Sequence, residues 1–227
     1  MRALPVGRHA LLVETGGPEA TAALHAELER RRAAGLLPPV REIVPAERTV
    51  LLDGVAEPRA LAADLARWEI PPAPRGAGRE IRLTVRWDGP DLAEVAAAWR
   101  VRPEEVAEIV GGARFRVAFC GFAPGFGYLT GLPERYRVPR RPTPRTAVPA
   151  GSVALAGRYA GVYPRSSPGG WQLVGSTDAV LWDPGREPAA LLVPGTGVRF
   201  VTAAGARGTG AAAEDAPGRP GGGEGAP

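Results

Sequence analysis

The stretch FRVAFCGFAPGFGYLTGLP, residues 115–133, joins an apolar strand pattern to a loop rich in glycine, proline and aromatic residues. Apolar and aromatic side chains dominate Phe115–Cys120, which favours a β-strand. Glycine lets a backbone approach a ligand closely, and aromatic rings supply apolar walls. We therefore interpret the loop as one wall of a ligand pocket, with a structural corner of a barrel as the alternative. The residues of this wall are Gly121, Phe122, Ala123, Pro124, Gly125 and Phe126.

Short apolar runs continue on both sides of this stretch, separated by turns of glycine and proline. Before it, Ile81–Trp87 alternates apolar and polar residues with the period of two of a half-buried strand. Many short strands with such turns predict a β-barrel or sandwich over residues 79–203. The later runs are Gly151–Ala156, Trp171–Val174, Val180–Trp182, Leu191–Val193 and Val198–Val201.

Two helices are expected between the first strand of this domain and Phe115. Asp91, with Glu94 three residues later, has the pattern of an N-terminal capping box, and an apolar stripe runs from there to Trp99. Pro103 is expected to begin the second helix, which the glycines at 111 and 112 end.

Residues 1–78 have the pattern of a small α/β domain. The expected order is strand, helix, strand, strand, helix, which suggests a split β-α-β unit of the ferredoxin-like type. The expected strands are Ala10–Val13, Val40–Val44 and Thr49–Leu52, and the expected helices are Pro18–Arg32 and one that follows Pro58.

Two further segments carry no apolar periodicity. Pro71–Gly78 has the composition of a linker, and residues 204–227 consist mainly of glycine, alanine and proline with scattered charges. The sequence therefore predicts an α+β protein: a ferredoxin-like domain over residues 1–78, a β-barrel domain over residues 79–203 and a disordered tail over residues 204–227.

Composition excludes several kinds of chemistry. All 28 basic residues among the 227 are arginine, so neither the lysine of a Walker A loop nor a Schiff-base lysine is present. Only His9 and His25 are histidines, and Cys120 is the single cysteine, so we expect no disulfide and no metal site. No apolar run is long enough for a membrane span or a signal peptide, and a soluble cytoplasmic protein is expected.

Residues 135–177 contain seven arginines and no acidic residue. Because guanidinium groups pair with carboxylates and phosphates, this asymmetry favours an anion-binding surface. The alternatives are a merely solvated rim and a patch that docks an acidic partner subunit. Nucleic acid is not expected as a partner despite an isoelectric point of 9.9, because the arginines alternate with proline and glycine instead of lining a helix.

The second dense motif is SSPGGWQLVGST, residues 166–177, in which a tight turn leads into an apolar strand. Serine hydroxyls and the N–H groups of such a turn can bind an anion without lysine. A hairpin with Trp171 as a plug of the core is an equally good interpretation, and Ser152 fits a structural role at a strand edge as well as ligand binding. The predicted substrate- or anion-binding residues are Arg140, Arg145, Ser152, Ser167, Gly169, Gly170 and Trp171.

Five stretches of the sequence together resemble the KipI family, whose members include the B subunit of bacterial 5-oxoprolinase and the first subunit of allophanate hydrolase. The resemblance covers residues 4–203 and implies a small α/β domain followed by a cyclophilin-like β-barrel. The stretches are VRWDGPDLAEVA (85–96), GFAPGF (121–126), TPRTAVPAGSVALAG (143–157), SPGGWQLVGST (167–177) and PGTGVRFV (194–201). Three positions depart from the family pattern: Val110 replaces a histidine, Phe115 a tyrosine and Gly127 a proline.

The resemblance implies an ATP-dependent opening of the 5-oxoproline lactam to glutamate, in which the amide oxygen is phosphorylated before water attacks. ATP is the implied cofactor of the complex, and no biotin is attached to this chain. Two partners are implied. One is a larger carboxyltransferase-like subunit, of the same type as KipA or the C subunit of 5-oxoprolinase, and the other is an A subunit of the LamB/YcsF type. The chain is expected to be inactive alone.

Two other functions fit the same resemblance. One is a subunit of allophanate hydrolase or of a urea carboxyltransferase, which biotin dependence of the assembled complex would distinguish. The other is an inhibitor that binds a sensor histidine kinase. The sequence identifies no general base, and Asp178 and Asp183 are the nearest later carboxylates.

Overall fold

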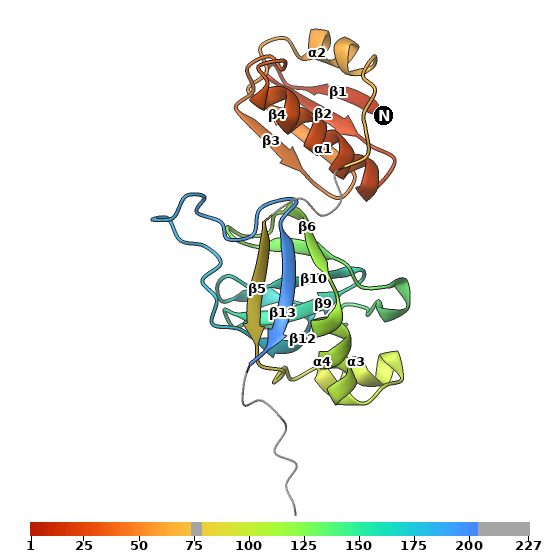
Figure 1. Ribbon diagram of the computed structural model, residues 1–227, viewed down its shortest axis with the longest axis vertical. Helices are drawn as coiled ribbons and strands as arrows, with labels where there is room; N and C mark the ends of the chain where they lie inside the picture. The colour runs from red at the N-terminus through yellow and green to blue at the C-terminus, as the bar shows by residue number, and fades with distance from the viewer. Residues whose placement is uncertain (74–78, 204–227) are drawn as a thin grey trace, which may run out of the picture.

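The computed structural model describes residues 1–73 and 79–203, which form an amino-terminal unit and a larger barrel unit (Figure 1). Residues 74–78 of the expected linker and the tail over residues 204–227 lie outside the described residues. The elements of the amino-terminal unit are β1 (Arg2–Val6), β2 (Ala10–Glu14), α1 (Pro18–Ala33), β3 (Glu42–Pro45), β4 (Thr49–Asp53) and α2 (Pro58–Leu65).

The amino-terminal unit is an antiparallel sheet of order β1-β2-β4-β3 with both helices packed on one face. Leu24 and Leu28 of α1 and Leu61 and Leu65 of α2 are buried against the apolar side chains of β2 and β4. Because β4 lies between β2 and β3, the segment β2-α1-β3 is a split β-α-β unit, as expected. The sequence did not predict β1, whose side chains are mostly exposed and which takes the edge position beside β2. The ferredoxin-like assignment therefore stays a prediction.

The barrel unit begins with β5 and contains two helices and eight further strands. Its elements are β5 (Glu80–Val85), α3 (Leu92–Trp99), α4 (Pro103–Gly112), β6 (Phe115–Cys120), β7 (Gly127–Thr130), a 3-10 turn (Glu134–Tyr136), β8 (Arg145–Val148), β9 (Ser152–Ala156), β10 (Tyr159–Val162), β11 (Ser167–Gly169), β12 (Gln172–Ser176) and β13 (Gly197–Thr202). Both expected helices are confirmed, and β5, β6, β9, β12 and β13 lie where the sequence predicts strands.

The seven-stranded sheet curls into a nearly closed barrel of order β12-β9-β10-β7-β6-β13-β5. The two edge strands meet at an isolated antiparallel bridge between Arg86 and Ser176, whose backbone groups exchange hydrogen bonds of 2.9 and 2.8 Å. The Arg86 guanidinium also binds the Asp178 carboxylate at 2.6 and 2.9 Å across this seam. The expected barrel is thus confirmed, and its cyclophilin-like assignment stays a prediction.

Both faces of the barrel wall around β9 are buried. Val153 and Leu155 point into the barrel core, and Ala154 and Ala156 contribute to a second apolar cluster on the outer face. The separate two-stranded sheet of β8 and β11 supplies Val148 to that outer cluster. Since every residue of β9 is buried, this strand has an unbroken apolar run without the alternation of β5.

Several expectations about the barrel need correction. Val180–Trp182 and Leu191–Val193 are not strands, and a single bridge joins Trp182 to Ala190 in this region. Strands β7, β8, β10 and β11 were missed, because each has only three or four residues and most are flanked or interrupted by glycine. Val110 is fully buried in the barrel core, so the side chain at this position contacts no solvent-accessible site. Within the described residues, no helix is long and apolar enough to cross a membrane.

Candidate functional site

The predicted loop wall and the predicted Trp171 come together on the outer face of the barrel. The loop folds back on itself, since the Gly121 N–H donates to the Phe126 carbonyl at 3.3 Å. The Phe126 ring thereby lies edge-on to Trp171 and to Tyr163, with centroid distances of 5.5 Å in both cases. The rings of this aromatic cluster are Phe119, Phe122, Phe126, Tyr128, Tyr159, Tyr163 and Trp171.

Two glycines make room for the buried rings of the aromatic cluster. A Cβ atom at Gly161 would lie 2.8 Å from the Phe126 ring and 3.2 Å from the Trp171 ring. A Cβ atom at Gly169 would collide with the phenol oxygen of Tyr163. Gly169, predicted as an anion-binding residue, thus has a packing role that accounts for its glycine.

Phe122 is the exposed member of the aromatic cluster. Its side chain is 58% exposed, and its ring lies 5.3 Å from Phe126 and 5.9 Å from Tyr163, centroid to centroid. The backbone at Phe122 has a φ of 67°, a left-handed conformation that costs a bulky residue on the order of 1–3 kcal/mol. Trp182, itself 43% exposed, approaches the same loop at Gly125. The loop therefore presents an aromatic side chain to solvent at an energetic cost, as binding surfaces do.

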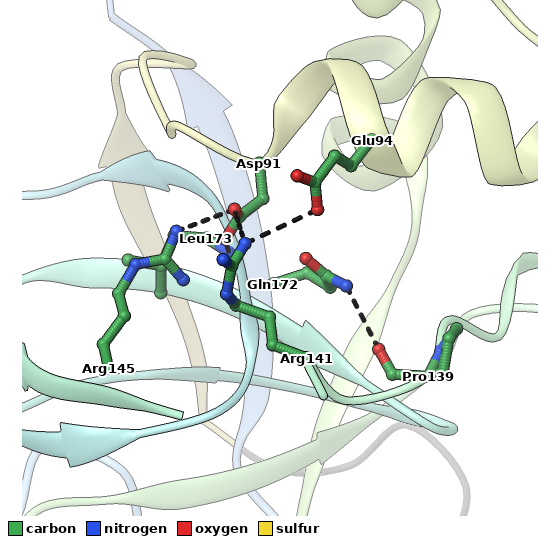
Figure 2. A network of polar contacts seen from close by, with 7 residues as sticks. All are labelled: Asp91, Glu94, Pro139, Arg141, Arg145, Gln172 and Leu173. Atoms are coloured by element: carbon green, nitrogen blue, oxygen red, sulfur yellow. Dashed lines mark hydrogen bonds and ion pairs between the residues drawn. The ribbon is translucent and has the colours of Figure 1, made fainter. Parts of the chain in front are cut away.

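A buried carboxylate organises the arginines next to this cluster (Figure 2). Asp91 is 1% exposed and accepts hydrogen bonds from Arg141 Nη1 at 2.6 Å and from Arg145 Nη2 at 2.7 Å. Its second oxygen accepts a hydrogen bond of 2.7 Å from the Leu173 N–H at the start of β12. Burial alone would raise the pKa of Asp91, but the hydrogen bonds from Arg145 and Leu173 outweigh it and keep the pKa below its ordinary value.

This network changes the interpretation of two predicted features. Asp91 is the residue before α3, but it makes no side-chain capping bond, so the expected capping box is wrong. Instead, Glu105 accepts a hydrogen bond of 2.8 Å from the Arg102 N–H in the first turn of α4. Arg145 donates through Nη2 to the Asp91 carboxylate, which it shares with Arg141, so its predicted role as an anion ligand depends on its remaining donors.

Three buried polar atoms beside Asp91 have no partner within the described residues. They are Arg141 Nε, Arg145 Nη1 and the Gln172 side-chain oxygen. The Gln172 amide nitrogen donates to the Pro139 carbonyl at 3.3 Å, which turns its oxygen toward the arginines (Figure 2). Buried polar groups are almost always hydrogen-bonded, so two donors and one acceptor without a partner identify a place for water or a polar ligand group.

Arg140 is the predicted anion ligand whose guanidinium is exposed and available to a bound ligand. Its side chain is exposed, and in residues 1–73 and 79–203 neither Arg140 nor Arg165 takes part in an ion pair. The Arg141 N–H donates to the Gly170 carbonyl at 2.8 Å, which places the neighbouring Arg140 near the segment that carries Trp171. Burial raises the pKa of the Tyr163 phenol, and the positive charge of Arg140 opposes that shift. An exposed guanidinium next to exposed aromatic carbon suits a ligand with an anionic and an apolar part.

The remaining predicted ligands are mainly structural. The Ser152 hydroxyl is buried and donates to the Pro149 carbonyl at 2.8 Å, in agreement with the alternative role at a strand edge. Ser167 is buried in β11, and its hydroxyl is 3.5 Å from the Arg165 carbonyl. The Gly170 carbonyl accepts a hydrogen bond of 2.8 Å from the Arg141 N–H and so holds the segment that carries Arg141 against the start of β12.

The described residues contain few groups for acid–base or metal chemistry. No group of three or more His, Cys, Asp or Glu side chains that could hold a metal ion occurs among them. Asp178 belongs to the barrel seam through Arg86, and Asp183 accepts a hydrogen bond from the Gly185 N–H within its own turn. Burial raises the pKa of Cys120 to about 11, so its thiol is not a reactive nucleophile near neutral pH.

Sequence reasoning missed Asp91, Gln172 and Tyr163 as parts of the site. Asp91 and Gln172 meet only because the barrel brings the segment after β5 against β12. One signal in the sequence could have indicated such a residue. Residues 135–177 contain no acidic residue, so any buried arginine in this segment must pair with a carboxylate from another part of the chain.

A family model described as "Carboxyltransferase domain, subdomain C and D" matches residues 1–192. The chain belongs to this family of carboxyltransferase domains. Curated relatives are named as the B subunit of 5-oxoprolinase. The one from Escherichia coli O157:H7 is 42% identical over 173 residues, 73% of this chain and 79% of the relative. The one from Bacillus subtilis (strain 168) is 49% identical over 113 residues, 50% of this chain and 47% of the relative.

Solved structures share the fold. TTHA0988 has a TM-score of 0.71 and 34% identity over 86% of this chain, which spans only 40% of that longer protein. PH0987 from Pyrococcus horikoshii has a TM-score of 0.54 and 31% identity, over 88% of this chain and 97% of that one. The Kluyveromyces lactis urea carboxylase has a TM-score of 0.62 at 19% identity over 89% of this chain and 22% of its own length, a likeness of fold alone.

Proposed function

We propose that this chain is the B-type subunit of an ATP-dependent 5-oxoprolinase, which converts 5-oxo-L-proline, ATP and water to L-glutamate, ADP and phosphate. The observation that carries the proposal is the name shared by the curated relatives at 42% and 49% identity. The site supports it, because the GFAPGF and SPGGW segments, far apart in the chain, pack into one aromatic cluster beside the exposed Arg140.

In the proposed reaction, the lactam oxygen attacks the γ-phosphorus of ATP and ADP leaves. Water then adds to the activated carbon, the ring C–N bond breaks, and phosphate departs to leave the new carboxylate of glutamate. This chain offers the exposed Phe122 ring as an apolar wall and Arg140 as a charge that can hold the substrate carboxylate or a phosphate.

A shared site explains why this surface is open. The described residues offer few free acid–base groups at the aromatic cluster, since Asp178 and Asp183 are already hydrogen-bonded and the exposed Glu47 carboxylate lies beside the Tyr159 phenol, whereas Phe122 and Trp182 face solvent. Both features suit a half-site that partner subunits complete, since activation of a lactam requires acid–base groups. The proposed partners are a larger carboxyltransferase-like subunit, of the same type as KipA or the C subunit of 5-oxoprolinase, and an A subunit of the LamB/YcsF type. ATP binds in the assembled complex, whose place is the cytoplasm, where ATP is available.

The decisive experiment reconstitutes the complex. We would co-express this chain with both partner subunits, purify the assembly and measure ATP hydrolysis with and without 5-oxoproline. The proposal predicts that 5-oxoproline stimulates hydrolysis, with one glutamate released per ATP. A stable complex without stimulation would reject the proposed substrate, and a dependence on biotin would point to the urea-carboxyltransferase alternative.

Substitution of the half-site then tests its role. Arg140→Gln should lower the 5-oxoproline-dependent rate at least about tenfold, the effect of losing one charged hydrogen bond. The matched control is Arg82→Gln, since Arg82 is an exposed arginine on β5. Equal rates for both variants would remove Arg140 from the site.

A further inference from the structure

A cleft of about 630 Å³ separates the amino-terminal unit from the barrel. One wall is a face of α1, and the other is formed by β6 and by the turn between β9 and β10. Strands β3 and β6 are in contact with each other, so the two units touch next to this cleft. Clefts of this size between domains are the usual place for small ligands, and the aromatic surface described above does not line it except through Phe119.

The face of α1 toward the cleft combines small apolar residues with Glu19, His25 and Glu29. Leu24 and Leu28 pack into the core of its own unit, whereas Ala22 and Ala26 face the cleft. A surface helix normally carries charged or polar residues opposite its buried stripe. Small apolar residues at this position leave open space with an apolar floor, to which Phe119 contributes from the barrel side.

The charged residues of the cleft are divided by wall. Glu19, Glu29 and Glu47 line it on the amino-terminal unit, and Arg116 and Arg158 line it on the barrel. Two contacts join the walls: the Arg158 guanidinium lies 3.9 Å from the exposed Glu19 carboxylate, and the Tyr159 phenol of β10 lies beside Glu47. One N–H of the Arg116 guanidinium donates a hydrogen bond of 3.0 Å to the Gly195 carbonyl, and its remaining donors are available to a ligand in the cleft.

The opposite charges of the two walls determine which kind of ligand the cleft can bind. A polyanion such as a nucleotide would face three carboxylates, and a simple amine would face two guanidinium groups, so each is repelled by one wall. A molecule with a positive and a negative end satisfies both walls, and its apolar part can lie on Ala22 and Phe119. We propose that this cleft binds a free α-amino acid with an apolar side chain, its carboxylate on Arg116 and Arg158 and its ammonium group toward Glu29 and Glu47.

The cleft and the aromatic cluster share the side chain of Phe119. Phe119 lines the cleft and also stacks on Tyr128 with a centroid distance of 4.4 Å, and the rings of Tyr128 and Trp171 lie 5.7 Å apart, centroid to centroid.

His25 lies in the acidic wall, 3.8 Å from Glu29. Burial lowers the pKa of His25, so near neutral pH it offers the ligand a hydrogen bond without a charge. The proposal concerns this chain alone and does not rest on the proposed enzymatic function.

Isothermal titration calorimetry of the full chain tests the proposal with three probes of matched shape. L-leucine carries both charges, 4-methylpentanoate carries only the carboxylate, and 3-methylbutylamine carries only the ammonium group. We expect saturable binding of L-leucine, and binding at least about tenfold weaker for each single-charge probe, as expected when a charged contact is lost. Equal binding of the three probes, or no saturable heat with L-leucine up to about 10 mM, would overturn the proposal.

Two variants locate the site. Arg158→Gln and Glu47→Gln should each weaken L-leucine binding at least about tenfold, whereas Arg82→Gln, on exposed β5, should leave it unchanged. Thermal unfolding midpoints of all three variants verify that they fold. If either cleft variant folds and binds L-leucine as the unmodified chain does, the ligand does not lie between these walls and the proposal fails.

Discussion

Two regions of the barrel unit, the Asp91 network and the exposed surface of Phe122 and Arg140, are built in opposite ways. Around Asp91, buried charges are paired, and both carboxylate oxygens are used. At Phe122, an aromatic side chain stays exposed on a left-handed backbone, and Arg140 has no acidic partner in the part of the chain that the structure describes. The first region fixes the closure of the barrel, and the second is available to a partner or ligand.

Removal of the Asp91 carboxylate should have the largest effect on this contrast. In Asp91→Ala, Arg141 and Arg145 lose the charge they share, and we expect a loss of about 3–5 kcal/mol in the free energy of unfolding. Urea denaturation of the full chain measures it. The matched control is Glu94→Gln: Glu94 is 62% exposed and 3.5 Å from Arg141, so its loss should cost at most about 1 kcal/mol. Equal losses for both variants would mean that the buried carboxylate does not stabilise the seam.

The two phenylalanines of the GFAPGF loop should separate stability from function. Phe126 is 2% exposed, and Phe126→Ala should destabilise the chain by about 3–5 kcal/mol. Phe122→Asn should change stability by at most about 1 kcal/mol, because it removes an exposed ring and relieves the left-handed backbone.

Activity of the reconstituted complex then distinguishes the roles of these rings. Phe122→Asn should lower the 5-oxoproline-dependent rate at least about tenfold while the chain remains folded, because it removes an apolar wall. If Phe122→Asn retained full activity and full partner binding, the exposed ring would have no role in the half-site.

The contrast also explains what sequence could predict. Period-two alternation identifies β5, and helix signals at Pro103 and Pro18 place α4 and α1 correctly. Both the GFAPGF and SPGGW motifs were predicted as ligand-site segments, but that they pack against each other is seen only in the structure. Which arginines are paired could not be predicted, since Asp91 is distant in sequence and its spacing to Glu94 imitates a capping box. Local patterns report local structure, whereas charge pairing across a barrel seam depends on strand order.

Close packing at the barrel seam should make it sensitive to a single methyl group. A Cβ at Gly175 would lie 2.5 Å from the Arg86 carbonyl oxygen and 2.9 Å from a Val85 methyl group, so Gly175→Ala should destabilise by about 1–3 kcal/mol. Gly112→Ala is the control, because no atom lies within 4 Å of its added Cβ, and it should be neutral or slightly stabilising. Urea denaturation compares the two variants. If Gly175→Ala left the free energy of unfolding unchanged, the seam would accommodate the added methyl group without destabilisation.

The smallest expected effect is the pH dependence of the Asp91 network. Because the folded-state pKa of Asp91 lies below its unfolded value of about 3.9, the unfolded chain binds a proton more readily as the pH falls. The stabilisation is therefore complete above about pH 4 and is lost as the pH falls through the lower folded-state pKa. Asp91→Asn keeps the shape but not the charge, so its stability should fall less steeply than that of the unmodified chain between about pH 5 and pH 3. Urea denaturation at a series of pH values measures both slopes. Parallel slopes would mean that Asp91 has the same pKa in the folded and unfolded chain, and that the two arginines do not hold it ionised.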